Sequence, residues 1–124
     1  MTIDEARIVL ENEIKSRGFE IHYRSSNTGC VWFKRKRCEI PFAKTRSTLY
    51  IVAHELFHCI EERKTKVYIN EMFAEKFAHN KIRELGFSVP RRQTRRAKKY
   101  VAWKLTKARC RGLKEIDKTV KQYI

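Results

Sequence analysis

The chain has 124 residues, 42% of them hydrophobic, so it has the length of one domain and enough apolar residues for a modest core. Its 29 Lys and Arg outnumber 14 Asp and Glu, and the resulting net charge of +15 favours partners with many negative charges. Four Gly and two Pro are too few for a collagen-like chain or for an all-β fold with many turns.

The start of the chain, MTIDEARIVLENE, does not resemble a signal peptide, because it is acidic and charges interrupt its apolar residues. No apolar run reaches the roughly 20 residues that a membrane-spanning helix needs.

The cysteines at positions 30, 38, 59 and 110 form no CxxC pair, and Cys59 lies in an apolar run typical of a buried thiol. A Cys30–Cys38 disulfide across a hairpin is an alternative, but we predict reduced cysteines in a cytoplasmic protein.

Helical periodicity is the most frequent pattern in the sequence. Apolar residues recur at helical spacing in five segments, residues 3–17, 47–62, 68–85, 91–109 and about 113–123. Thr2 and Gly18 are suited to begin and end the first of these helices. The segment 47–62 is apolar nearly all round at its centre, which is typical of a buried helix, and the charged residues after it predict a short connection to the next helix.

Strands are expected between the first two helices. FEIHYR (19–24) and CVWFKRKR (30–37) are rich in aromatic and β-branched residues, and the SSNTG between them predicts a hairpin loop. CEIPF (38–42) is expected as a third short strand, which Pro41 restricts to an edge of the sheet or to ending there. These segments predict a small antiparallel sheet.

The most specific motif is HExxH, formed by His54, Glu55 and His58 in the helix expected to be buried. A shuffled chain of this composition would carry the motif about once in eighty trials. Histidines four positions apart lie on one face of a helix, so both imidazoles can bind one zinc ion. Glu55 can then take a proton from a metal-bound water and pass it to a leaving amine. The alternative is two helix histidines satisfied by hydrogen bonds.

A catalytic zinc site also needs a third protein ligand and an open position for water. The next helix offers Glu71, Glu75 and His79 on one face. In an antiparallel pair of helices, Glu71 lies level with His58 and Glu75 lies level with His54. We therefore expect Glu71 to be the third ligand and Glu75 to accept the second N–H of His54. His79 lies one turn farther and is expected to be a partly buried helix histidine.

HELFH followed by NEMFAE (70–75) resembles the gluzincin metallopeptidases, the group of thermolysin and aminopeptidase N. The spacing within EMFAEKFA (71–78) is also similar to that of the small ImmA/IrrE-type metallopeptidases. The resemblance implies a compact zincin-like fold, zinc ligands at His54, His58 and Glu71, and a general base at Glu55. The SprT-like DNA-associated proteases also combine HExxH with a basic surface, but their third ligand is a histidine, for which His79 would be the candidate.

The carboxyl-terminal segment, residues 91–124, is strongly basic, with 13 Lys and Arg against Glu115 and Asp117. An apolar stripe at Ala97, Val101, Leu105 and Ala108 predicts that one helical face packs on the core. The opposite face would expose the residues suited to a nucleic acid: Arg92, Arg95, Arg96, Lys99 and Trp103. A solubilising surface, or one for an acidic protein, is the alternative.

The sequence therefore predicts an α+β fold in which residues 1–90 form a zincin-like metallopeptidase core and 91–124 a basic helical extension packed on it. The predicted function is a zinc-dependent peptidase with Glu55 as general base. Its substrate would be a peptide or protein, with a DNA-associated or regulatory protein as one class. The sequence assigns no residue to stabilising the oxyanion, and Tyr68 and Tyr100 are the two tyrosines considered for it. The alternative is a basic nucleic-acid-binding module whose zinc site is structural or inactive.

Overall fold

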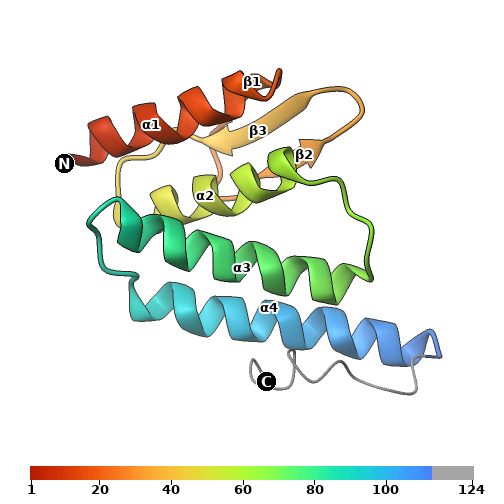
Figure 1. Ribbon diagram of the computed structural model, residues 1–124. Helices are drawn as coiled ribbons and strands as arrows, with labels where there is room; N and C mark the ends of the chain where they lie inside the picture. Colours follow the sequence, from red (N-terminus) through yellow and green to blue (C-terminus); the bar gives the residue numbers. More distant parts are fainter. Residues whose placement is uncertain (113–124) are drawn as a thin grey trace.

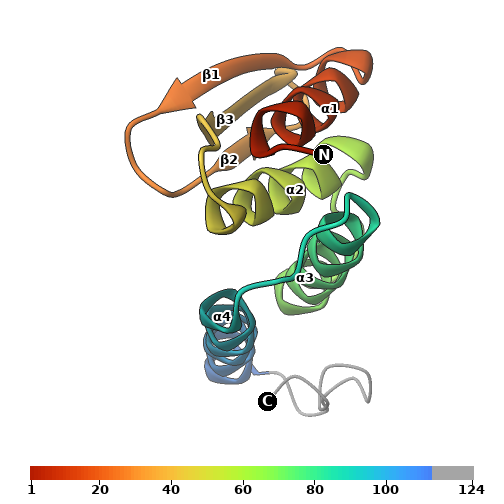
Figure 2. The same cartoon turned by 90° about the vertical axis from the view of Figure 1, so that its left-hand side faces the viewer.

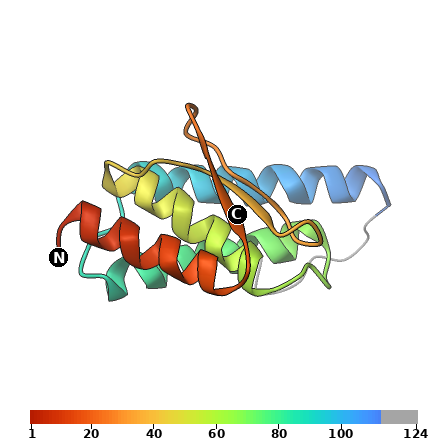
Figure 3. The same cartoon turned by 90° about the horizontal axis from the view of Figure 1, so that it is seen from above.

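The structure is a computed structural model that describes residues 1–112. Its elements are α1 (Ile3–Ser16), β1 (Glu20–Arg24), β2 (Cys30–Trp32), β3 (Arg37–Pro41), α2 (Arg46–Ile60), α3 (Val67–Glu84) and α4 (Arg91–Cys110). Within these residues the helices and one small sheet confirm the predicted α+β class. The sheet and α1 lie at one side of the molecule, followed by α2, then α3, then α4 (Figures 1 and 2). Seen from above, the strands cross the direction of the helices (Figure 3).

Local hydrogen bonds fix where the first two helices begin. The Thr2 hydroxyl accepts a hydrogen bond from the Glu5 amide at 3.1 Å, as its capping position predicted. Before α2, the amides of Thr45 and Thr48 each donate to the other residue's hydroxyl, at 3.0 and 3.2 Å. Gly18 follows α1 with φ at +86°, a conformation that glycine adopts without steric cost.

The prediction of an antiparallel sheet is wrong, because the sheet is mixed and its strand order is β1-β3-β2. β1 and β3 are parallel, β2 and β3 are antiparallel, and the segment 25–29 therefore does not form a hairpin loop. Instead β3 takes the centre, because Cys38 and Ile40 are its most buried side chains and pack on the helices. On its outer face Glu39 accepts a hydrogen bond from Arg24 of β1 at 2.8 Å, which supports the parallel pair. Pro41 is the last residue of this central strand.

The cysteines are free in the described residues, and the sheet register separates Cys30 from Cys38. Cys30 lies opposite Glu39, and Cys38 lies opposite Val31. The disulfide alternative therefore does not occur, while the burial expected for Cys59 is confirmed. Within residues 1–112, none of the helices combines the length and hydropathy needed to cross a membrane.

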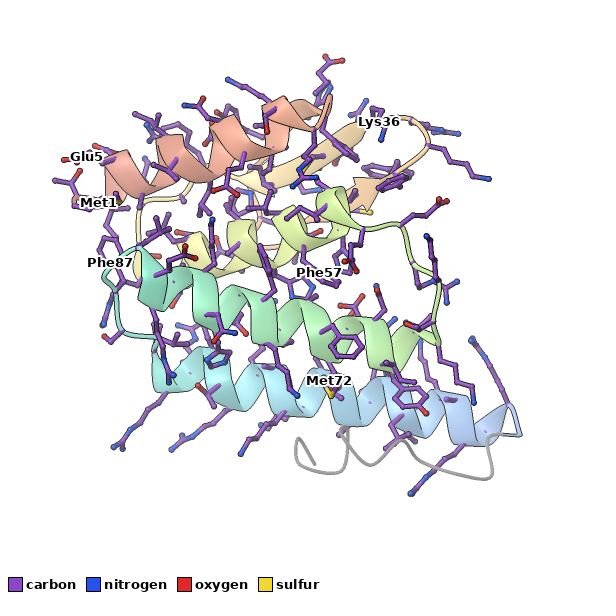
Figure 4. The ribbon with its side chains drawn as sticks, in the orientation of Figure 1. Met1, Glu5, Lys36, Phe57, Met72 and Phe87 are labelled. Atoms are coloured by element: carbon purple, nitrogen blue, oxygen red, sulfur yellow. The ribbon has the colours of Figure 1, made fainter. Side chains whose placement is uncertain are left out.

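The basic helix α4 packs on α3, as its apolar stripe predicted. Val101 and Leu105 are buried against Tyr68 and Met72 of α3 in a small second core. Figure 4 shows Met72 between the two helices and Phe57 between α2 and α3. The helix expected at about 113–123 lies outside the described residues.

Candidate metal centre

Two antiparallel helices bring the three predicted metal ligands together. His54 and His58 lie one turn apart on α2, and Glu71 lies near the start of α3, after a connection of residues 61–66. Glu71 Oε2 is 3.0 Å from His54 Nε2 and 3.5 Å from His58 Nε2, and the two Nε2 atoms are 3.3 Å apart. The residues that meet are therefore those predicted from the sequence, although Glu71 Oε2 lies nearer to His54 than to His58, with which it was expected to be level.

The geometry and chemistry of this cluster fit a metal ion. Two imidazole nitrogens and a carboxylate oxygen are ligands that zinc and similar divalent ions accept. Ligands held about 2.0–2.1 Å from a tetrahedral ion lie about 3.3–3.4 Å from one another, close to the separations observed here. Glu71 Oε2 is buried, and the neighbours it faces are the two imidazole nitrogens. His54, His58 and Glu71 thus form a group that could hold a metal ion.

The electrostatics of the cluster also favour a cation between its members. Burial lowers the pKa of His54, but hydrogen bonds to Glu71 and Glu75 outweigh burial and raise this pKa to about 10. Burial raises the pKa of Glu71, whereas contacts with His54 and His58 lower it to about 2. Both shifts arise because carboxylates surround the imidazoles, and a metal ion satisfies the same attraction by replacing a proton.

A second set of side chains orients the two histidines. His54 Nδ1 lies 2.9 Å from Glu75 Oε1, the position expected for Glu75. The Tyr50 hydroxyl donates a hydrogen bond to the other oxygen of Glu75. The amide group of Asn70, which is buried, lies 3.3 Å from His58 Nδ1. The roles of Tyr50 and Asn70 were not predicted, although Tyr50 lies one turn before His54 and Asn70 directly before Glu71.

His79 lies outside the cluster, as predicted. Its ring packs edge-on against Tyr50, with 5.2 Å between the ring centroids. Its side chain is partly buried, and burial lowers its pKa. Within residues 1–112, the group suited to a metal contains Glu71 rather than His79.

Glu55 lies beside the cluster where two cavities meet. Cavities of about 210 and 350 Å³ share four lining residues, Gly29, His54, Glu55 and Tyr100. The Glu55 side chain is 7% exposed; burial raises its pKa, while the neighbouring His54 and His58 lower it. A buried carboxyl with a raised pKa accepts a proton more readily than one in water does. The structure therefore places this buried carboxyl next to the metal-ligand group, in the wall that the two cavities share.

The structure also separates the two tyrosines considered in the sequence. Tyr100 of α4 lines both cavities, whereas Tyr68 is buried between α3 and α4. Burial and the nearby carboxylates of Glu71 and Glu55 raise the pKa of Tyr100. Its hydroxyl therefore stays protonated and can donate a hydrogen bond into the site.

Gly29 allows the chain after β1 to pass directly over Glu55. A Cβ atom on Gly29 would lie 2.5 Å from Glu55 Cγ and 2.9 Å from Cδ. The φ of Gly29 is not positive, so a larger residue would cause no backbone strain. The steric contact with Glu55 alone therefore sets the free-energy cost of a larger residue here. No property of the sequence other than the glycine itself indicated this close approach.

Gly29→Ala should therefore destabilise the protein by about 1–3 kcal/mol, the usual cost of overpacking a filled site. Urea unfolding of the variant, with Ser26→Ala in the same loop as control, measures this cost. The double variant Gly29→Ala/Glu55→Ala lacks the clashing atoms, so the alanine at 29 should then cost little. An equal cost in both backgrounds would show that Glu55 does not limit the space at this position.

The five residues predicted for nucleic-acid contact, Arg92, Arg95, Arg96, Lys99 and Trp103, are all exposed on α4. The helix carries nine Lys and Arg and no Asp or Glu. Within residues 1–112 the ion pairs lie elsewhere, on the sheet, on the first three helices and in the metal-ligand group. Apart from the half-buried Lys104, the cations of α4 are thus exposed, and none has a neutralising partner among the described residues.

Comparison of the chain with protein-family models, with curated proteins and with solved structures gives no match.

Proposed function

We propose that the protein is a zinc-dependent peptidase that holds zinc through His54, His58 and Glu71. One observation carries the proposal: the three ligand atoms converge next to the buried carboxyl of Glu55, at the junction of two cavities. A purely structural metal site is closed by four protein ligands, whereas a site with three ligands beside a cavity leaves room for water and substrate. The resemblance of HELFH and NEMFAE to gluzincin sequences supports the same conclusion.

The chemistry divides among the residues around the cluster. Zinc, when bound, lowers the pKa of water and polarises a carbonyl group. Glu55 accepts the proton of the attacking water and then donates it to the leaving amine. Tyr100 donates a hydrogen bond to the carbonyl oxygen as negative charge develops there. Glu75 holds His54 in the tautomer whose Nε2 faces the metal, because it accepts the hydrogen of Nδ1.

The edge strand β2 offers a place for an extended peptide. β2 pairs with β3 on one side only, so the other side of its backbone is available for hydrogen bonds. Cys30 and Val31 of this strand line the larger cavity together with Glu55 and Glu71. A peptide that adds to β2 would therefore run past the metal-ligand group.

Removal of the metal tests this function. Purified protein should contain close to one zinc ion, and a chelator should abolish hydrolysis of an unfolded protein, which zinc should restore. Elemental analysis and a fluorescent casein assay measure the two quantities on one sample. Protein that contains no zinc after zinc supplementation would contradict the proposal.

The second candidate function is a nucleic-acid-binding module whose zinc site is structural or inactive. The exposed cations of α4, which have no neutralising partner within residues 1–112, favour it. A stoichiometric zinc ion without hydrolysis of any unfolded protein would support this candidate over the peptidase. The two functions are compatible if the substrate is itself a protein bound to nucleic acid.

A further inference from the structure

A third cavity lies where the end of α4 meets the connection between α2 and α3. Its volume is about 460 Å³. Five cationic side chains line it, Arg63, Lys66, Lys104, Lys107 and Arg111, and the remaining described lining residues are uncharged. These side chains come from segments about forty residues apart in the sequence, so the fold itself assembles this concentration of charge.

Among the residues that the structure describes, this basic cavity has no neutralising partner. No carboxylate in residues 1–112 forms an ion pair with any of the five side chains. Arg63 donates a hydrogen bond to the Thr65 carbonyl at 3.3 Å, and Lys107 Nζ lies 3.8 Å from the centroid of the Trp103 ring. These contacts orient the side chains but do not reduce their charge. Like charges that converge in one cavity repel one another, so an anion with several charges would bind there favourably.

We propose that the basic cavity binds the phosphodiester backbone of a nucleic acid. The exposed Arg92, Arg95 and Lys99 carry further positive charge along the same helix. A helix of 20 residues is about 30 Å long, which matches several consecutive phosphates. Trp103, half exposed on the same helix, adds an aromatic surface of the kind on which bases stack. A regular, multiply charged chain fits this arrangement better than a short acidic peptide does.

The basic cavity also adjoins the candidate metal centre. Arg63 and Val67 line both the basic cavity and the cavity of about 350 Å³ beside Glu71. A nucleic acid bound along α4 would therefore pass the mouth of that cavity. This arrangement would bring a protein carried by the nucleic acid within reach of the site, although binding itself requires neither the metal nor Glu55.

The test compares two charge reversals of equal size in the full-length protein. Lys66→Glu/Lys107→Glu alters the basic cavity, whereas Lys15→Glu/Arg17→Glu alters exposed cations at the end of α1, in a layer that α2 and α3 separate from α4 (Figure 2). Fluorescence anisotropy with a labelled 20-nucleotide DNA, as duplex and as single strand, is measured at several salt concentrations.

The cavity variant should bind at least about tenfold more weakly, and the slope of log affinity against log salt should fall by about 1.4–1.8 for two lost phosphate contacts. The DNA affinity of the α1 variant should fall by less than about threefold, since this variant changes only the long-range electrostatic field. The Glu55→Gln variant should bind DNA like the wild type, so this result does not depend on peptidase activity. An equal loss in both reversals, or displacement of the DNA by poly-glutamate of the same charge at equal concentration, would overturn the proposal.

Discussion

Glu55→Gln should reduce peptide hydrolysis by at least about 10²–10⁴-fold, the contribution typical of a general base. The amide has nearly the size of the carboxylate, so it still fits beneath Gly29, but it cannot accept the proton of the attacking water. The zinc content should be unchanged, because the predicted ligands are His54, His58 and Glu71. Initial rates on unfolded protein and elemental analysis of the same samples measure both effects.

Two further variants locate this effect at the site. Glu84→Gln, an exposed residue at the end of α3, makes the same chemical change and should leave hydrolysis unaltered. Tyr100→Phe removes the hydroxyl from the shared wall of the two cavities and should lower kcat by about 10²-fold while zinc is retained. Full proteolysis by Glu55→Gln would show that another group takes the proton, and the assigned mechanism would then be wrong.

The helices and their meeting point could be predicted because both depend on local periodicity. A spacing of four places His54 and His58 on one face of a helix, and the short connection 61–66 forces the next helix to run antiparallel beside it. Residue counting then brings Glu71 within reach of the two histidines. The packing of α4 was predictable for a similar reason, because its apolar stripe required a partner.

The order of the strands was not predictable in the same way. Aromatic and β-branched residues identify strands but do not determine which strands pair. The composition of the loop 25–29 was also typical of a hairpin loop. The pairing is decided by long-range burial, which places Cys38 and Ile40 of β3 under the helices and makes β3 central. The same limit applies to Gly29, Tyr50 and Asn70, whose roles depend on contacts between segments distant in the sequence.

Glu71→Ala should weaken zinc binding by at least about 100-fold, because losses of 10–100-fold are typical even when only an outer partner of a ligand is removed. Its Oε2 atom is buried and lies 3.0 and 3.5 Å from the two histidine nitrogens, where it can serve as a ligand. His79→Ala should retain zinc, since its ring packs on Tyr50 outside the cluster. Competition with a chromophoric chelator measures both affinities under identical conditions.

The pair of variants also decides between the two kinds of protease that share HExxH and a basic surface. Loss of zinc in Glu71→Ala with retention in His79→Ala assigns two histidines and a glutamate as ligands, as the gluzincin resemblance implies. The reverse ranking would mean that α3 must shift along α2 by about two turns on metal binding to bring His79 to the level of Glu71.

Such a shift would break the contacts of Glu75 with His54 and Tyr50, so Glu75→Gln offers an independent check. It should weaken zinc binding by about 10–100-fold if the observed pairing of α2 and α3 holds the metal, and it should have no effect if the helices realign.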